Sequence, residues 1–345
     1  MQATIHATRL FAEVVVSART LLLGTGLAAS LTVPLMPASG QESKTYAETP
    51  KDIVHLLTGT GHSTSAYLAD DMRMVLSSNA DFQLLPSITD GDLANIEDIL
   101  ALDFVDLIFS HINVLEYFFE TGLEPKIKQK LSYLTKMHNE EFHLLARADI
   151  SNFSMLNGKK VNIGQNVDVT YITATEIFHQ NGVDVIATTS PHLMAYSLLK
   201  AGEIDAMAIV DGSPSDLLRL ASLDDGVRLL DVPAEGLSKT YVPSRLDNKD
   251  YPKLLAPGDS IATVAVPTVL MAYAWPDGSE KRGALDRFID AFLEALPTLR
   301  SRERAFHVKW QEVDLWAPLL GGWQRDPYLI ERLNPMKRFK GSGNG

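Results

Sequence analysis

The sequence has 345 residues, of which 46% are hydrophobic and 21% charged, and its formal net charge is −12. This length accommodates two domains with substantial cores, and this composition excludes a largely disordered chain. The acidic balance argues against nucleic acid and anionic membrane surfaces as partners, and a chain without cysteine has no disulfide, thiolate metal site or lipoprotein anchor.

Residues 1–40 have the pattern of a secretory signal peptide. Two arginines precede an apolar run from 21 to 33, and small residues then lead to expected cleavage between Gly40 and Gln41. The apolar run is short for a membrane span, and an uncleaved N-terminal anchor is the alternative interpretation. Removal of residues 1–40 takes away two arginines and one glutamate, which changes the net charge from −12 to −13.

Residues 56–68 are expected to join a strand, at 53–57, to a helix through two glycines. Apolar residues recur at helical spacing after the glycines, and Ser63 or Thr64 is expected to cap the helix. Glycines let backbone amides approach a ligand, and a helix N-terminus attracts an anion. The turn therefore suits a carboxylate or another small anion, with a plain strand-to-helix bend as the alternative.

Strands and helices alternate through the next hundred residues. Apolar runs predict strands at 81–86, 105–110 and 142–147, and helical periodicity predicts helices at 93–100, 111–120 and 126–137. Thr89 or Asp90 is expected to cap the first of these helices. This order is typical of a mostly parallel sheet covered by helices.

A second alternating unit follows residue 147. It is expected to contain strands at 160–164, 183–188, 204–210 and 227–232 and helices at 170–180, 192–200 and 215–221, with Ser190 and Pro191 starting the second helix. Residues 233–260 are predicted to be irregular, 261–274 to return as a long strand to the first unit, and 281–299 to be helical. We therefore expect one domain from residues 41–147 and 261–345 and a second from residues 148–260.

Four polar or glycine-bearing turns join predicted strands to helices, at 58–64, 110–113, 164–170 and 211–215. In open α/β sheets, ligands collect outside the carboxyl ends of the strands. Two units facing each other would bring four helix N-termini to one cleft, which favours a ligand site over plain connections.

Known catalytic motifs are absent. Gly59-Thr60-Gly61 lacks the third glycine of a dinucleotide fingerprint, and 212–215 does not form a nucleophile elbow. The stretch 138–143, His-Asn-Glu-Glu-Phe-His, fits no metalloprotease motif and is interpreted as a solvated turn. His62 and His111 each stand at a strand-to-helix junction, where an imidazole can contact a ligand or serve only the cap. We predict no catalytic residue and no metal site.

Five stretches between residues 52 and 275 occur in a distinctive order: Thr58-Gly59-Thr60-Gly61…Tyr67, Asp106-Leu107-Ile108-Phe109-Ser110-His111-Ile112-Asn113-Val114-Leu115, Gly158-Lys159-Lys160-Val161-Asn162-Ile163-Gly164, Gly202-Glu203-Ile204-Asp205-Ala206…Gly212-Ser213-Pro214, and Ala262-Thr263-Val264-Ala265-Val266. Together they resemble the TAXI family of TRAP-transporter solute-binding proteins. The match covers nearly three quarters of the chain that follows the signal peptide.

The resemblance implies an α/β, two-domain periplasmic-binding-protein-like fold of the type II kind, with the ligand cleft between the domains. It implies a periplasmic protein that captures a small carboxylate-bearing ligand and delivers it to a TRAP-type membrane permease. The ligand would be an amino acid such as glutamate or glutamine, or a dicarboxylate. The resemblance implies no enzyme activity, no cofactor and no membrane insertion after signal cleavage. With the turns, it predicts a ligand-binding set: Gly59, Thr60, Gly61, His62, Ser63, Tyr67, His111, Asn113, Gln165, Asp168, Thr170, Asp211, Gly212 and Pro214.

Several of these positions depart from the family pattern. His62 replaces a glycine, His111 and Asn113 replace Gln and Asp, and Asp168 stands where the family has a neutral donor. Asp168 and Asp211 would repel a second carboxylate, so we expect an amine-bearing acid. Its carboxylate would lie at the amides of 59–63 and its ammonium near Asp168 or Asp211. The alternative is that Asp168 only caps its helix.

Two other functions follow from the same residues. A related binding module could act as a ligand sensor for a receptor or kinase, which the departures and the unusual Trp-rich C-terminal segment favour. An exported hydrolase using His62 or His111 with Asp168 is the least favoured hypothesis.

Overall fold

The computed structural model describes residues 52–77, 81–165, 168–318 and 321–340, the side chains of 335–340 excepted. The predicted signal peptide and its cleavage site lie outside these residues.

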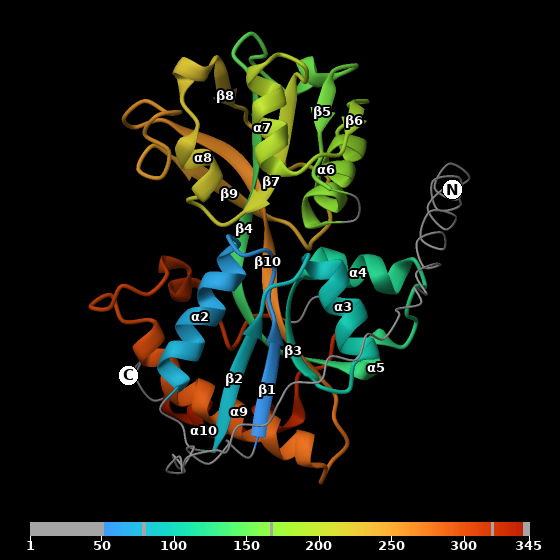
Figure 1. Cartoon of the computed structure of the whole chain (residues 1–345), viewed down its shortest axis with the longest axis vertical. Helices are drawn as coiled ribbons and strands as arrows, with labels where there is room; N and C mark the ends of the chain where they lie inside the picture. Colours follow the sequence, from blue (N-terminus) through green and yellow to red (C-terminus); the bar gives the residue numbers. More distant parts are fainter. Residues whose placement is uncertain (1–51, 78–80, 166–167, 319–320, 341–345) are drawn as a thin grey trace, which may run out of the picture. The chain divides into compact units, whose positions relative to one another are not determined.

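Strands and helices alternate along most of the described chain (Figure 1). Their bounds are β1 Asp52–Leu57, α2 Thr64–Leu76, β2 Phe82–Ser87, α3 Asp92–Ala101, β3 Val105–His111, α4 Ile112–Glu120, α5 Ile127–Lys130, β4 Leu131–Arg147, η1 Phe153–Leu156, β5 Lys160–Asn162, α6 Val169–Gln180, β6 Ile186–Thr188, α7 His192–Lys200, β7 Ala206–Asp211, α8 Asp216–Leu220, η2 Leu223–Asp225, β8 Val227–Leu229, β9 Val242–Asp247, β10 Ser260–Tyr273, α9 Glu280–Leu299, η3 Val308–Glu312 and α10 Pro327–Lys340.

The strands form one ten-stranded sheet in the order β2-β1-β3-β10-β4-β7-β5-β6, with β8 paired to β4 and β9 to β10. The predicted α/β class is confirmed. The sheet is mixed rather than mostly parallel, however, because β10 and β4 run antiparallel to all their neighbours. Parallel pairing is confined to β2-β1-β3 on one side and β6-β5-β7 on the other.

The antiparallel pair β4 and β10 links the two parallel sets (Figure 1). The pairing runs from Tyr273 opposite Leu131 to Ala265 opposite Glu141. The first part of β4 is thus separated from β3 only by β10, which pairs with both. The second part of β4 pairs with β7 and β8. The prediction that the long strand near 261–274 returns to the first unit is confirmed by its pairing with β3.

The predicted helix at 126–137 is wrong beyond its first turn. Only Ile127–Lys130 is helical, and Leu131 begins the 17-residue strand β4. Ladder hydrogen bonds to β10 and near-complete burial of the strand override the local helical pattern. The predicted solvated turn at 138–143 is wrong for the same reason, because this stretch lies inside β4.

Strand β9 lies in the segment predicted to be irregular. Its sequence, Val-Pro-Ser-Arg-Leu-Asp, has no clean apolar alternation, and a proline normally argues against a strand. The proline is tolerated because β9 pairs with only one neighbour, β10, in the described sheet.

Helix starts follow the predictions only in part. Ser63 caps α2, as predicted, by accepting a hydrogen bond from the backbone N–H of Ala66. Helix α3 instead begins after Gly91, whose φ is 112°, without a side-chain cap. The carboxylate of Asp92, the first residue of α3, turns to His111 instead.

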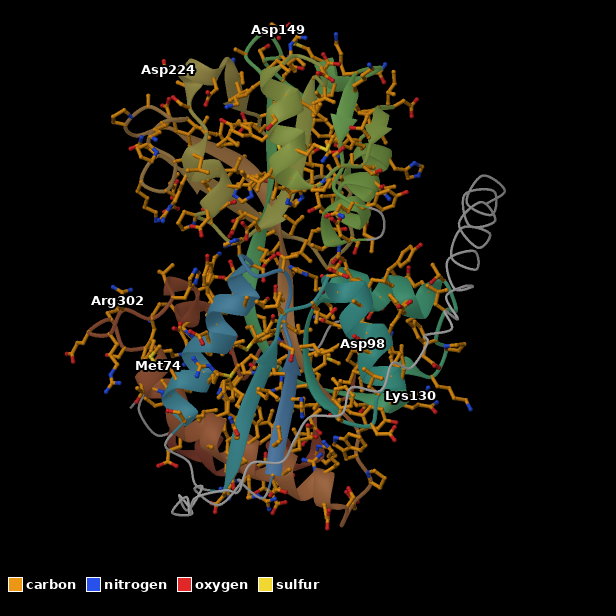
Figure 2. The ribbon with its side chains drawn as sticks, in the orientation of Figure 1. Met74, Asp98, Lys130, Asp149, Asp224 and Arg302 are labelled. Carbon is orange, nitrogen blue, oxygen red and sulfur yellow. The ribbon has the colours of Figure 1, made fainter. Side chains whose placement is uncertain are left out.

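The C-terminal segment packs into the same core as α2 and α9. Leu68 and Met72 of α2 share an apolar cluster with Phe288 and Trp310, whereas Met74 lies on the outer side of α2 (Figure 2). Trp310 is fully buried and donates its indole N–H to Asp71 at 2.9 Å. Trp310 therefore anchors the C-terminal segment in the core.

Replacing Trp310 by Ala should lower the free energy of unfolding by about 3–5 kcal/mol, because a large buried ring leaves a cavity and Asp71 loses its donor. Urea unfolding followed by circular dichroism measures the change. Val308→Ala is the matched control, since this neighbouring side chain is 62% exposed and should stay within about 0.5 kcal/mol of wild type. A Trp310→Ala loss no larger than the control's would contradict the assignment.

Candidate functional site

The turn between β1 and α2 offers free backbone amides. Thr60, Gly61 and His62 are exposed, and their N–H groups donate to no acceptor among the described residues. The preceding Gly59 is held by a hydrogen bond from the N–H of Thr89 to its carbonyl, and a Cβ there would lie 2.9 Å from the Ser63 hydroxyl. Glycine therefore lets the chain bend closely around the helix cap and leaves the three amides outward.

The turn after β7 lies directly against the start of α2. A Cβ at Gly212 would collide with the hydroxyl of Thr64, so only glycine permits this approach. Next to this contact, the Tyr67 hydroxyl donates to the Asp216 carboxylate at 2.9 Å. The structure thus brings together the turns that carry the predicted residues Tyr67 and Gly212, which lie far apart in the sequence.

The other two turns also meet. The side-chain amide of Asn113 donates to the Thr173 hydroxyl at 2.9 Å and to the Tyr241 hydroxyl at 3.3 Å. The hydroxyl of Thr170 accepts from the backbone N–H of Val210 at 3.1 Å, which ties the start of α6 to the end of β7. The predicted residues Asn113 and Thr170 therefore belong to one hydrogen-bonded region with the fourth turn.

Asp168 is the N-cap of α6, the alternative role considered for it. Its carboxylate accepts from the backbone N–H groups of Tyr171, at 2.7 Å, and Gln165, at 2.9 Å. Burial nevertheless raises the pKa of Asp168 to about 6, because these two donors offset only part of the desolvation. Gln165 is exposed and contributes its backbone to the cap.

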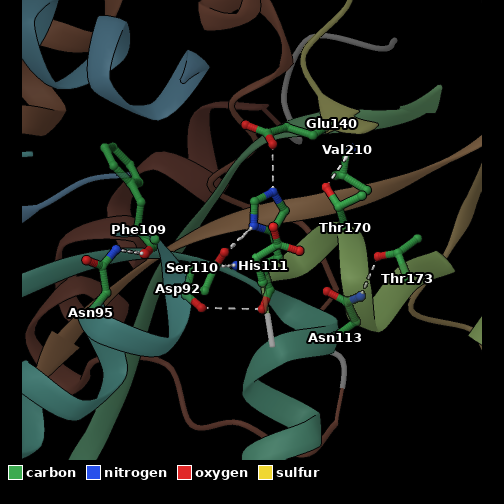
Figure 3. Close-up of polar contacts among 12 residues, drawn as sticks. Asp92, Asn95, Phe109, Ser110, His111, Asn113, Glu140, Thr170, Thr173 and Val210 are labelled. Carbon is green, nitrogen blue, oxygen red and sulfur yellow. Dashed lines mark hydrogen bonds and ion pairs between the residues drawn. The ribbon is translucent and has the colours of Figure 1, made fainter. Parts of the chain in front are cut away.

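His111 lies buried between two carboxylates (Figure 3). Its Nδ1 lies 2.9 Å from Asp92 Oδ2, and its Nε2 lies 2.8 Å from Glu140 Oε2. Burial alone would lower the pKa of His111, but the two carboxylates raise it well above the usual value. Both ring nitrogens therefore act as donors of an imidazolium.

Glu140 extends this network along β4. Its second oxygen, Oε1, lies 3.0 Å from Nε2 of His138, which is fully buried. Burial raises the pKa of Glu140, but the charge of His111 and the hydrogen bonds from both histidines outweigh it, and the pKa lies well below its ordinary value. Burial lowers the pKa of His138, so this second imidazole is the neutral donor in the chain.

Asp211, unlike Glu140, has no positively charged partner among the described residues. Its carboxylate accepts from the N–H of Gly212 at 2.8 Å. Burial, and after it the charge of Glu140, raises the pKa of Asp211 to about 8. The junction of the turns therefore holds three carboxylates besides Asp211, namely Asp92, Glu140 and Asp168, against one imidazolium, and it favours a positively charged group.

The arrangement favours binding rather than hydrolysis. Both nitrogens of His111 are occupied by carboxylates, so this residue has no lone pair for a general base. Asp168 is held by its helix cap, and His62 is exposed on the first turn. Among the described residues, no group of three or more His, Asp or Glu side chains is placed to hold a metal ion. No helix in the described ranges is long and apolar enough to cross a membrane.

Sequence reasoning missed several residues of this region. Glu140 was assigned to a solvated turn, although the spacing of His138 and Glu140 would place both on one face of a strand. Nothing in the sequence signalled that Asp92 would bond His111, or that His307 would stack on Tyr67 with ring centroids 5.9 Å apart. Lys309 likewise reaches Glu141 of β4, at 3.0 Å, from the C-terminal segment.

Residues 118–280, a little under half of the chain, match the model of the NMT1-like family. The structure is similar to a periplasmic sulfonate-binding protein SsuA, of a putative sulfonate ABC transporter, from Methylobacillus flagellatus KT. The sequence identity is 10% and the TM-score 0.51, over 84% of this chain and 96% of that chain. No curated protein matches the sequence.

Two further similar structures have TM-scores of 0.47 and sequence identities of 17%. They are the alkanesulfonate-binding protein SsuA from Xanthomonas axonopodis pv. citri bound to MOPS, which covers 83% of this chain and 84% of that one, and the aliphatic sulphonate-binding protein SsuA from Escherichia coli, with 81% and 78%. The likeness to the Methylobacillus protein establishes the fold, which is that of a periplasmic binding protein.

Replacing His111 by Gln should destabilise the protein by about 3–5 kcal/mol near pH 6, because two buried carboxylates lose their cation. The pKa of His111 is raised on folding, so its stabilising effect is complete below the unfolded pKa and is lost as pH rises through the folded pKa. Urea unfolding at about pH 6 and pH 10 should therefore show a smaller difference at the higher pH. His62→Gln, at an exposed histidine, is the control, and equal losses at both pH values would contradict the charged state of His111.

Replacing Asp211 by Asn should stabilise the protein, in contrast to the replacement of His111. Burial raises the pKa of Asp211 from 3.8 to about 8, so between about pH 4 and 8 the unfolded chain ionises this group while the folded protein keeps it protonated, and stability is lost as the pH rises. We expect Asp211→Asn to stabilise the protein by about 1–3 kcal/mol near pH 8 and to have little effect near pH 4. Thermal unfolding at the two pH values measures this, with exposed Asp277→Asn as control. Destabilisation near pH 8 would refute the unpaired carboxylate.

Proposed function

We propose that the chain is an exported solute-binding protein that holds a small ligand where the four turns meet. The contacts Gly212 to Thr64, Asn113 to Thr173 and Thr170 to Val210 support this, because together they connect the four turns at the carboxyl ends of their strands. The family resemblance adds a TRAP-type permease of the TAXI class as the membrane partner and the periplasm as the location.

We further propose two domains, formed by residues 41–147 with 261–345 and by residues 148–260. Helix α9 packs on α2 beside β1 and β2, while α7 packs against β7, which supports this division. The strands β4 and β10 would then be the connections about which the domains close. The hydrogen bonds Tyr67 to Asp216 and Asn113 to Thr173 belong to the closed form in this proposal.

The ligand proposed here is an amino acid or a similar amine-bearing acid. Its carboxylate would accept from the exposed N–H groups of Thr60, Gly61 and His62, beside the N-terminus of α2. Its ammonium would lie near Asp211, because Asp168 already satisfies its carboxylate by capping α6. Asp211 pairs with no cation among the described residues, and a bound ammonium would supply one and favour its ionised form; this observation carries the choice over a dicarboxylate.

A ligand sensor for a receptor or kinase is the second candidate. The unusual C-terminal segment had favoured it, but this segment packs into the main core through Trp310 and Trp323. Because these two tryptophans are buried in the core, they no longer favour a signalling role, and transport is the preferred proposal. A neighbouring gene for a TRAP membrane subunit, rather than for a sensor kinase, would support it.

Calorimetry on protein stripped of ligand by unfolding and refolding tests the ligand class. Glutamate and glutamine should bind more tightly than succinate or 2-oxoglutarate, and Asp211→Asn should weaken amino-acid binding by about tenfold or more because the ammonium loses its charged acceptor. Native mass spectrometry of the untreated protein identifies any ligand that it retains.

Asp277→Asn is again the matched control and should bind like wild type. Tight succinate binding without amino-acid binding would refute the amine-bearing ligand and leave a binding protein for dicarboxylates. Turnover of ester or amide substrates that is lost in His111→Ala would instead refute the binding-protein proposal.

A further inference from the structure

A cavity of about 300 Å³ lies between the end of α8 and the loop that follows β9. Its walls are formed by Leu218, Arg219 and Ala221 on one side and by residues 249–253 on the other. Its buried floor is formed by Leu218 and Tyr251, which are each 1% exposed. The volume is at the small end of ligand sites and corresponds to about ten water molecules.

The lining carries an excess of positive charge. Arg219, Lys249 and Lys253 face one carboxylate, Asp250, so the lining has a net charge of +2. Arg219 and Lys253 form no ion pair within the described residues, and Lys249 reaches Asp247 only at 3.7 Å in an exposed pair. The lining is thus basic although the chain as a whole has a net charge of −12.

The cavity is fixed to the turn after β7 by two hydrogen bonds. The Ser213 hydroxyl donates to the Asp250 carboxylate at 3.3 Å, so the one acidic group of the lining is already engaged. The Tyr251 hydroxyl accepts from the backbone N–H of Ser215 at 2.8 Å, and it lies 2.7 Å from Nε2 of His143 in β4. The loop 249–253 is thus held in place against the turn after β7.

We propose that this cavity binds a small dianion with the chemistry of a phosphate group. The net charge of +2 matches a dianion, and the planar guanidinium of Arg219 can donate two parallel hydrogen bonds to phosphate oxygens. Lys249 and Lys253 supply the further charge from the opposite wall. This site is separate from the junction of the four turns, and it does not depend on the ligand proposed there.

Calorimetric titration of the full chain with inorganic phosphate, at constant ionic strength, tests the proposal. We expect saturable binding that weakens at least tenfold in the double variant Arg219→Gln/Lys253→Gln. The control Arg302→Gln/Lys239→Gln removes the same charge from exposed positions elsewhere (Arg302 is labelled in Figure 2) and should bind phosphate like wild type. Absence of saturable binding, or equal weakening in both double variants, would overturn the proposal.

Two further measurements locate the anion and its source. Amide chemical shifts should move at 218–221 and 249–253 on addition of phosphate, and shifts confined to other residues would overturn the assignment. If vesicles of phosphatidic acid retain the protein, free phosphate should displace it from them. Retention that phosphate cannot displace, without a calorimetric signal, would assign a lipid surface instead and refute a small dianion. If the double variant does not fold, Lys253→Gln alone should weaken binding at least threefold.

Discussion

The antiparallel pairing of β4 with β10 is the constraint on which the other features of this structure depend. The two strands, of 17 and 14 residues, are long enough to pair with β3 at one end and with β7, β8 and β9 at the other. This pairing puts the ends of β3 and β7 within reach of the middle of β4. The four turns can meet because β4 and β10 fix the positions of the strands that precede them.

The middle of β4 carries an unusual density of buried polar groups. His138, Glu140, Glu141 and His143 are each at most 6% exposed, and each has a partner on another element or in the same strand. Burying a charge without a partner is costly. Glu140 can be buried because it pairs with His111, and Glu141 because it pairs with Lys309. Asp211, at the end of the neighbouring strand β7, is the carboxylate left without a cation, and this difference gives the junction its preference for a positive group.

The C-terminal segment completes this region rather than extending from it. Lys309 pairs with Glu141, His307 stacks on Tyr67, and Trp310 fills the core beneath α2. Tyr67 in turn bonds Asp216 from the turn after β7. A segment more than 150 residues distant from β4 in the chain therefore supports both the buried charges and the closing contacts of the turns.

The sequence by itself determined the elements that local chemistry specifies. Apolar runs and helical periodicity located β1, β3, β10, α2 and α9, and Ser63 was identified as a cap because a serine at that position can satisfy a free N–H. The glycines at 59 and 61 likewise indicated a turn whose backbone can be approached closely. These features depend on neighbours along the chain, and a single sequence contains that information.

Only the tertiary structure decided which distant groups meet. Residues 131–137 form strand rather than helix because β10 supplies their hydrogen bonds, and the stretch 138–143 is buried because the same pairing carries it into the sheet. The pairing of His111 with Asp92 and Glu140 joins residues 19 and 29 positions apart, and that of Lys309 with Glu141 joins residues 168 positions apart. Ionisation and burial are set by such partners, because electrostatic energies depend on distance in space and on the exclusion of water, and neither is encoded in the local pattern of residues.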